Sequence, residues 1–174
     1  MTEVQLESKR LLLRQWRESD FAPYAKLCAD KDVMRYLGGK ALSRAEAWRH
    51  MAFLIGHWEL RSYGHFAVEE KASGNFIGRL GFLNPEGWPG FEIGWTLARE
   101  AWGKGYATEG ARVALEYAFA DLDRAHVISL IHPDNQASMR VAERLGEKRE
   151  GVAEVFDHPV IVFGIDRSAY VRPD

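Results

Sequence analysis

The sequence predicts a mixed α/β fold in which a central, mostly antiparallel sheet is flanked by helices. Apolar residues alternate with period two in the middle of the chain and follow the period of a helix on either side of it. A glycine-containing turn at 103–105 joins one such strand to a helix. With 174 residues, of which 47% are hydrophobic, we expect residues 1–174 to form one domain with a sizeable core.

The first half of the chain is expected to contain one strand, then helices, then an antiparallel pair of strands. Ser73 and Gly74 supply the turn between the paired strands. In chain order, the expected elements are a strand over Arg10–Trp16, a helix from Ser19 or Asp20 to about Cys28, a helical turn over Asp32–Leu37, a helix from Ser43 to about Arg61, and strands over His65–Glu70 and Asn75–Leu83.

The helix that follows Ser43 has a clear start signal. Ser43 and Glu46 have the spacing of a capping box, in which the two side chains reciprocally satisfy backbone N–H groups. Apolar side chains then recur at helical spacing and are expected to form one apolar stripe, made of Trp48, Met51, Ile55 and Trp58.

The second half of the chain is expected to alternate strands and helices. A loop rich in Pro and Gly occupies residues 84–90, and Gly146 closes the last helix. In chain order, the expected elements are a strand over Phe91–Leu97, a helix over Gly105–Leu122, a strand over Ala125–Ile131, a helix over Asn135–Leu145 and a final strand over Pro159–Asp166.

The composition argues against several classes of protein. A formal charge of −2 and a pI near 6.3 disfavour a nucleic-acid partner, since nucleic-acid binders usually present a basic face. Cys28 is the single cysteine, and His50 and His57 lack a zinc spacing, so no metal is expected. Residues 1–15 lack the core of a signal peptide, and no apolar run is long enough to cross a membrane. We therefore expect a cytoplasmic protein without a membrane partner.

The loop at 103–105 has the features of an anion site. Glycine at both ends allows a tight turn and a close approach of the backbone to a ligand. A helix that follows points unpaired N–H groups and the positive end of its dipole at the loop, which suits a phosphate. No Walker run exists, and Thr108 stands where a dinucleotide fingerprint needs glycine or alanine. The alternative is a glycine turn without a ligand.

Three motifs, in the right order and spacing, resemble the GNAT family of acyl-CoA-dependent N-acetyltransferases, and most closely its RimJ/RimL-like branch. Ile93–Trp95 with Trp102–Glu109 is similar to motif A, Arg10–Arg14 with Ser19 and Asp20 to the opening of that branch, and His132–Ser138 with Leu145 and Gly146 to motif B. The resemblance covers nearly the whole chain. It implies a GNAT-like fold with splayed central strands, acetyl-CoA as co-substrate and transfer of its acetyl group to an amine.

The resemblance assigns the glycine loop to the pyrophosphate of coenzyme A. Gly105 and Ala107 match the last two fixed positions of the family signature Arg/Gln-x-x-Gly-x-Gly/Ala, whereas Trp102 stands at the Arg/Gln position. This departure is usual in the RimJ/RimL-like branch. The expected donors are the backbone N–H groups of Gly103, Lys104, Gly105, Tyr106, Ala107 and Thr108.

The strand ahead of the loop is assigned to the pantetheine arm. In the family its end, here Trp95, Thr96 and Leu97, splays away from a neighbour, here Ala125–Ile131, and its backbone groups bind the pantetheine amides. A backbone N–H at this end is also the natural donor to the oxyanion. The alternative is an ordinary core strand, because its apolar residues alternate.

The helix of motif B carries two further candidates. By resemblance, the side chain of Asn135 contacts the pantetheine arm, while the alternative is that Asn135 simply caps its helix. Ser138 lies one turn further on, where its hydroxyl could reach the thioester sulfur as a catalytic group. Many relatives use a tyrosine as the acid at the position of Ala142, and some use a base at the position of Leu130, so both groups are absent here.

Glu92 is the first candidate for the general base that takes the proton of the attacking amine. It lies on the strand of the expected thioester site and shares a strand face with Gly94. Aromatic neighbours would desolvate its carboxylate and raise its pKa. The alternative is a carboxylate at the edge of the strand, paired with Arg79 or Lys104.

The acceptor is expected to be a primary amine, either a protein N-terminus or a small molecule. Trp88, in the loop before the strand of Glu92, is expected at the rim of the acceptor pocket. His65 is interpreted as a packed or exposed strand histidine. The final strand with His158–Phe163 is a candidate edge for a homodimer. The alternative function is a catalytically weak acyl-CoA-binding or sensor protein.

Overall fold

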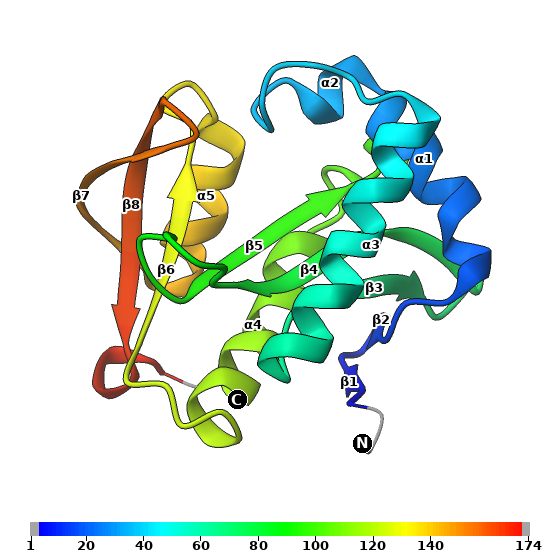
Figure 1. Cartoon of the computed structure of the whole chain (residues 1–174). Coiled ribbons are helices and arrows are strands. Elements are labelled where there is room, and N and C mark those ends of the chain that lie inside the picture. Colours follow the sequence, from blue (N-terminus) through cyan, green and yellow to red (C-terminus); the bar gives the residue numbers. More distant parts are fainter. Residues whose placement is uncertain (1–3, 172–174) are drawn as a thin grey trace.

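The computed structural model describes residues 4–171, which form an eight-stranded sheet with helices on both faces (Figure 1). The strand order is β1-β2-β3-β4-β5-β6-β8-β7, and every neighbouring pair is antiparallel except β5 and β6. The expected mixed, mostly antiparallel sheet is confirmed. The strands are β1 (Leu6–Glu7), β2 (Leu11–Arg14), β3 (His65–Glu70), β4 (Asn75–Leu83), β5 (Glu92–Leu97), β6 (His126–Ile131), β7 (Lys148–Val155) and β8 (His158–Asp166).

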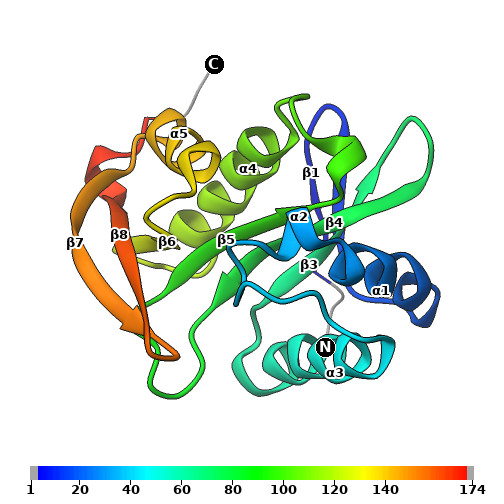
Figure 2. The ribbon, with the colours of Figure 1, turned by 90° about the horizontal axis from the view of Figure 1, so that it is seen from above.

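Two layers of helices enclose the sheet (Figure 2). On one face, buried side chains of α1 and α3 such as Leu27 and Leu54 form a core cluster. On the other face, Leu115 of α4 packs with Leu80 and Ile93 of the sheet in the main core. The helices are α1 (Phe21–Ala29), α2 (Lys31–Met34), α3 (Arg44–Arg61), α4 (Tyr106–Ala120) and α5 (Gln136–Leu145), with 3-10 turns at Glu18–Asp20, Arg99–Ala101 and Arg167–Ala169.

All the elements expected from the sequence are present, but two strands were not expected. β1 is only two residues long, too short to show a period. β7 is rich in charged residues and mostly exposed, so it lacks the apolar alternation by which a half-buried strand is found. β7 pairs along the outer side of β8, so the expectation that the final strand offers the edge of a dimer is wrong.

Helix α3 begins as expected but buries a different stripe. Its capping box is confirmed, with Ser43 N–H donating to the Glu46 carboxylate at 2.7 Å and Glu46 N–H to the Ser43 hydroxyl at 3.2 Å. Trp48 and Ile55 are wrongly placed in the apolar stripe, since they are 59% and 44% exposed. The buried stripe consists of Ala47, Met51, Leu54 and Trp58. Both stripes have helical spacing and share two members, so periodicity alone does not choose between them.

The sheet opens between β5 and β6, as expected for splayed central strands. Glu92 is the one residue of β5 in register with β6, opposite Ile128, and the Ile128 N–H donates to the Phe91 carbonyl at 3.0 Å. Beyond this point the two strands diverge, which leaves a gap with α5 on its far side (Figure 1).

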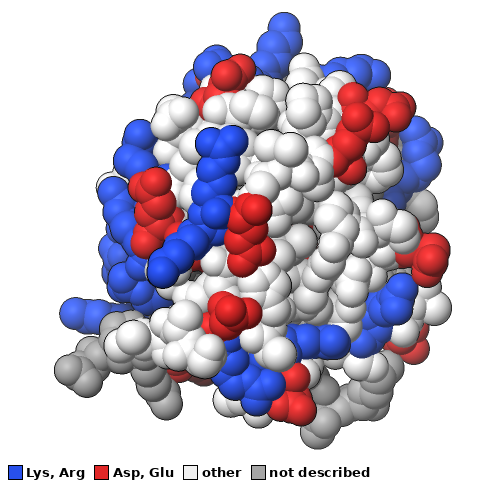
Figure 3. All heavy atoms as spheres, turned by 90° about the vertical axis from the view of Figure 1, so that its left-hand side faces the viewer, with Lys and Arg blue, Asp and Glu red and all other residues white. Residues whose placement is uncertain are grey.

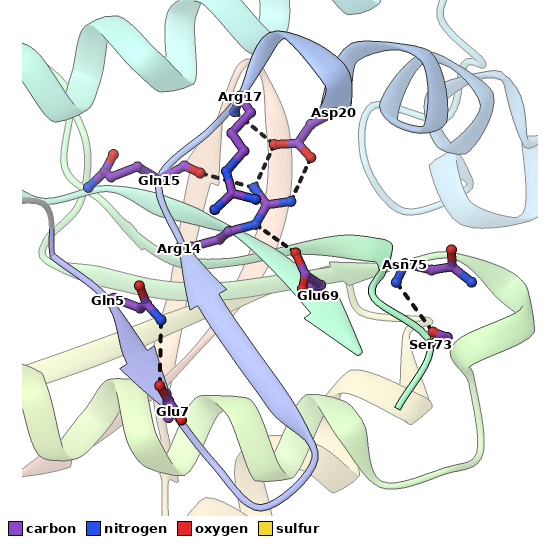
Figure 4. A network of polar contacts seen from close by, with 9 residues as sticks. All are labelled: Gln5, Glu7, Arg14, Gln15, Arg17, Asp20, Glu69, Ser73 and Asn75. Carbon is purple, nitrogen blue, oxygen red and sulfur yellow. Dashed lines mark hydrogen bonds and ion pairs between the residues drawn. The ribbon is translucent and has the colours of Figure 1, made fainter. Parts of the chain in front are cut away.

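A buried ion-pair network anchors the start of α1 to the sheet (Figure 4). The Arg14 guanidinium donates to both carboxylate oxygens of Asp20, at 2.8 and 2.9 Å, and to Glu69 at 2.9 Å. Asp20 also accepts from the Arg17 backbone N–H at 2.8 Å. Arg14 and Asp20 are 4% and 2% exposed. The Asp20 side chain therefore binds β2 and makes no capping bond to α1.

The surface on the side of β7 and β8 carries charges of both signs. Figure 3 shows Lys and Arg side chains next to Asp and Glu side chains, with uncharged surface between them. Within the described residues, no helix is both long and apolar enough to span a bilayer.

Candidate functional site

The loop before α4 presents a row of unpaired backbone amides. Gly103 and Gly105 have φ values of 72° and 79°, a conformation that favours glycine, so the expected tight turn is present. Within residues 4–171, the N–H groups of residues 103–108 have no hydrogen-bond partner. The positive end of the α4 dipole lies behind these consecutive donors, and such an arrangement can bind an anion.

Aromatic and basic side chains fix the loop. The Trp102 indole N–H donates to the Leu97 carbonyl at 2.8 Å, which ties the loop to the end of β5 and gives tryptophan a structural role at this position. The Arg10 guanidinium lies 4.4 Å and the Lys104 ammonium 5.8 Å from the centroid of the Tyr106 ring. The charge of Lys104 adds to the attraction of the loop for an anion, whereas Arg10 is paired with Glu109 at 2.6 Å.

The gap between β5 and β6 exposes backbone groups of β5. Ile93 directs its carbonyl toward β6, where it accepts from the Ser129 hydroxyl at 3.1 Å. Because alternate residues of a strand direct their backbone groups to the same side, Trp95 and Leu97 also face the gap. Thr96 directs its backbone groups toward β4 instead, and its buried side chain lines a cavity beneath α1.

Helix α5 begins on the far side of the gap with Asn135 and Ser138 in its first turn. Asn135 Oδ1 accepts from the Ser138 backbone N–H at 3.1 Å, so Asn135 caps α5. This is one of the two alternatives that the sequence left open. The cap uses only the carbonyl oxygen of the side chain, and its amide nitrogen keeps its own donors for another partner. Ser138 is partly buried beside it, and Ala142 is fully buried one turn further on.

Glu92 lies where β5 and β6 meet, at the closed end of the gap. The Trp88 indole N–H donates to its Oε2 at 2.7 Å. Burial among its neighbours raises the pKa of Glu92 to about 7, although the bond from Trp88, the charge of Arg79 and a bond from the Leu130 backbone act in the opposite direction. Within the described chain Glu92 forms no ion pair with Arg79 or Lys104, so the paired-carboxylate alternative is not found. A carboxyl group with this pKa is part-ionised at neutral pH and can accept a proton.

His65 and Arg79 share the sheet face of Glu92. His65 Nε2 and Glu92 Oε1 lie 3.5 and 3.6 Å from the position that a β-carbon on Gly94 would occupy. Arg79 donates to His65 Nδ1 at 2.9 Å, so Nδ1 is the acceptor and Nε2 carries the proton of a neutral ring. Burial and the nearby Arg79 charge hold the pKa of His65 well below its usual value. His65 is thus packed, as one reading of the sequence expected, and sits beside the candidate base.

Glu147 is a buried acid that sequence reasoning missed. It is 3% exposed, and its Oε1 lies 3.0 Å from the Ser129 hydroxyl that donates to Ile93. Burial raises the pKa of Glu147 to about 8, so the group is mostly protonated at neutral pH. A protonated Glu147 can donate to Ser129, which completes a chain of hydrogen bonds from the residue before β7, through β6, to β5. Its place directly after the helix-ending Gly146 is a weak sequence signal.

An aromatic pair stands beside Glu92. The rings of Trp88 and Phe156 lie 5.7 Å apart, which joins the loop before β5 to the turn between β7 and β8. Phe156 is 82% exposed, whereas Trp88 is partly buried against the carboxylate. Trp88 therefore binds the candidate base directly, a contact that its loop position does not reveal.

Comparisons with known proteins agree with this geometry. Residues 10–148 match the family model of the acetyltransferase (GNAT) domain. The uncharacterized protein YkkB of Bacillus subtilis is 32% identical over 177 residues, which cover 97% of this chain and 98% of YkkB. An acetyltransferase from Agrobacterium tumefaciens has a similar crystal structure, with a TM-score of 0.86, 26% identity and 96% of both chains covered. Mycobacterium smegmatis RimJ, solved in complex with CoA-disulfide, shares the fold with a TM-score of 0.72 at 16% identity over 95% of this chain and 87% of its own.

Proposed function

The chain belongs to the GNAT family of acetyltransferases, and we propose that it is an N-acetyltransferase of the RimJ/RimL-like branch that transfers the acetyl group of acetyl-CoA to a primary amine. The observation that carries the proposal is the row of unpaired amides at 103–108 next to the opened edge of β5. A pyrophosphate binds convergent N–H donors at a helix N-terminus, and pantetheine amides bind a free strand edge. The two features lie side by side and together suit coenzyme A.

The residues around the loop and the gap fit this donor. A β-carbon on Gly103 would meet nothing within 4 Å, and one on Gly105 would meet only the Arg10 guanidinium, so phosphate oxygens can approach the backbone. We assign Trp95 and Leu97 to the pantetheine arm through their backbone groups, and Asn135 through its amide nitrogen. Thr96 faces the other side of the sheet and is assigned to the acceptor side.

In the proposed reaction, both substrates are bound together and the amine nitrogen attacks the carbonyl carbon of the thioester. Glu92 takes the proton that the amine loses, directly or through one water. A backbone N–H of Trp95 or Leu97 stabilises the oxyanion, and the C–S bond then breaks. The thiolate needs little help to leave, since free thiols have a pKa of about 8.5. Ser138 is the remaining candidate to donate to the sulfur, because Ala142 carries no acidic group.

The rate of acetyl transfer should follow the ionisation of Glu92. A base with a pKa of about 7 is protonated in acid, so kcat should rise about tenfold per pH unit below pH 7 and level off above it. The assay measures thiol release from saturating acetyl-CoA over pH 5.5–9. Two amines of different basicity serve as the control. If the rising part of the pH profile reports ionisation of the amine, its midpoint changes with the amine. If it reports ionisation of Glu92, its midpoint stays the same.

Two outcomes would contradict these assignments separately. A flat profile between pH 6 and 8 with active enzyme would contradict Glu92 as the base. Binding of acetyl-CoA without thiol release with any amine of a broad panel would contradict the transferase proposal. That second result would favour an acyl-CoA-binding or sensor protein. The lack of a general acid at the position of Ala142 favours the same alternative.

A further inference from the structure

A cavity that is partly open to the surface lies on the opposite side of β5 from the main core, between the sheet and the helices α1 to α3. It has a volume of about 160 Å³, and its walls include Tyr24, Cys28, His50, Arg79 and Thr96. A protein cavity of this size holds a molecule about as large as benzene. Arg79 and Thr96 are direct partners in the β4–β5 register, so the floor of the cavity is the sheet face that also carries Glu92.

Arg79 is a buried cation that forms no ion pair within the described residues. Its residue is 8% exposed, one guanidinium nitrogen donates to His65 Nδ1, and its buried Nε has no partner in the described chain. None of the ion pairs formed within residues 4–171 includes Arg79. Burying an unpaired charge is costly, and proteins normally pair such a group or use it to bind a ligand.

The polar side chains that line the cavity with Arg79 do not supply a negative charge, and Glu92, on which its charge acts, lies outside that lining. Burial and the charge of Arg79 lower the pKa of His50 to about 4, so His50 is neutral at pH 7. Burial raises the pKa of the Tyr24 hydroxyl and of the Cys28 thiol, so neither ionises at that pH. The Tyr24 hydroxyl is also bonded to His50 Nδ1 at 2.6 Å. The cavity therefore presents one positive charge and neutral walls.

Arg79 and the candidate base lie on the same face of the sheet. Arg79 holds the His65 ring, and the other nitrogen of that ring lies beside Gly94, next to the carboxylate of Glu92. The charge of Arg79 also acts on Glu92, whose pKa it lowers, so the two groups are near enough to bind the two ends of one small molecule. A guanidinium pairs with a planar carboxylate through two parallel hydrogen bonds, one of which its free Nε can supply.

We propose that Arg79 binds the carboxylate of the acceptor and that the acceptor is a small free amino acid. The proposal rests on the acetyl transfer proposed above and narrows its substrate class. A protein N-terminus carries a neutral amide where a free amino acid carries its carboxylate, so it would leave Arg79 unpaired. The volume of the cavity, about 160 Å³, suits a small side chain such as that of alanine or serine.

The test compares amines that differ only in carrying either a charged carboxylate or a neutral amide. Thiol release from acetyl-CoA is measured with glycine, L-alanine and L-serine and with the amide of each. The amides have less basic amines, which favours them as nucleophiles, so a preference for the acids must come from the protein. The wild type should use at least one acid with a kcat/KM about tenfold or more above that of its amide. Arg79→Met should abolish this preference, and Arg79→Lys should keep part of it.

Arg49→Met is the matched control, because Arg49 is exposed on the neighbouring helix and the variant changes the net charge equally. It should keep the wild-type preference. Arg79→Met should also keep the acetyl-CoA affinity, and its Tm should be unchanged or higher, because it removes an unpaired buried charge. A lower Tm together with an unchanged preference would mean that Arg79 is structural and would overturn the proposal.

A binding measurement separates the two proposals. Propionate should bind the wild type at least about tenfold more tightly than propionamide, and Arg79→Met should lose this difference. Equal binding of the two probes, or tighter binding of inorganic phosphate than of propionate, would overturn the carboxylate assignment. Failure of acetyl-CoA to bind would contradict the proposed function, and the propionate result would still decide whether Arg79 is an anion site.

Discussion

Replacing Glu92 by glutamine should lower kcat by about 10²- to 10⁴-fold, the range that a general base typically contributes. Glutamine keeps the shape of the side chain and an oxygen that can accept from Trp88, but it cannot take a proton from the amine. Acetyl-CoA affinity should stay within a few-fold of the wild type, because Glu92 is not among the groups assigned to bind acetyl-CoA. Steady-state thiol release and calorimetric titration with acetyl-CoA measure the two quantities.

Trp88→Phe is the matched control for this variant. It keeps the aromatic wall but removes the indole N–H that donates to Glu92 at 2.7 Å, a bond that lowers the pKa of the carboxyl. The acid limb of the pH profile should therefore move to higher pH, with kcat on the plateau nearly unchanged. If Glu92→Gln kept kcat within a few-fold, the proton would leave by another route and Glu92 would only help to bind the acceptor.

Asp20→Ala should lower the free energy of unfolding by about 3–5 kcal/mol, the cost of breaking a buried ion pair by removing one partner. Asp20 is 2% exposed and holds both terminal nitrogens of Arg14. Without it, the buried Arg14 keeps only Glu69 as a carboxylate partner, and the backbone N–H of Arg17 loses its acceptor. Urea denaturation of both proteins under the same conditions gives the difference.

Glu86→Ala is the control for a surface ion pair. Its carboxylate is fully exposed and lies 3.9 Å from Arg61, a geometry for which about 0–1 kcal/mol is expected. A loss below about 1 kcal/mol for Asp20→Ala would show that the network does not anchor α1. The Asp20→Ala variant should lose activity only in proportion to its unfolded fraction, because Asp20 lies outside the proposed donor and acceptor contacts.

Local pattern predicted the parts of the site that depend on neighbouring residues. Two glycines before a helix predict the anion loop, because the backbone conformation and the helix dipole are set within a few residues. Alternation placed Glu92 on the strand face of Gly94, since side chains of a strand change sides at each residue. The opening of β5 from β6 depends on pairing far along the chain, and it was expected only from the resemblance of Ile93–Trp95 and the loop to motif A.

The contacts of the site that were not predicted from the sequence depend on which elements, distant along the chain, lie next to each other in the fold. Arg79 was considered as a counter-ion of Glu92, because a sequence does not show that the histidine of another strand lies between the two. The bond from Trp88 to Glu92 likewise depends on how the loop folds back over β5. The buried stripe of α3 was predicted wrongly because two stripes with helical spacing overlap on this helix. Contacts with α1 and the sheet bury Leu54 rather than Ile55.

A calorimetric titration with acetyl-CoA tests most directly whether the loop at 103–108 binds coenzyme A. The wild type should bind acetyl-CoA with a Kd of about micromolar order, about −8 kcal/mol, and should not bind ATP comparably. Gly105→Glu should weaken acetyl-CoA binding by about 100-fold or more, because it adds a negative charge and a side chain where the pyrophosphate is expected.

Gly74→Glu is the matched control, since Gly74 has a similar φ of 69° and open space around it in the turn between β3 and β4. It introduces the same strain and the same charge away from the loop and should bind acetyl-CoA as the wild type does. Micromolar binding that only Gly105→Glu abolishes is the result we predict. Absence of acetyl-CoA binding by the folded wild type, or binding that Gly105→Glu leaves intact, would contradict the assignment of this loop to coenzyme A.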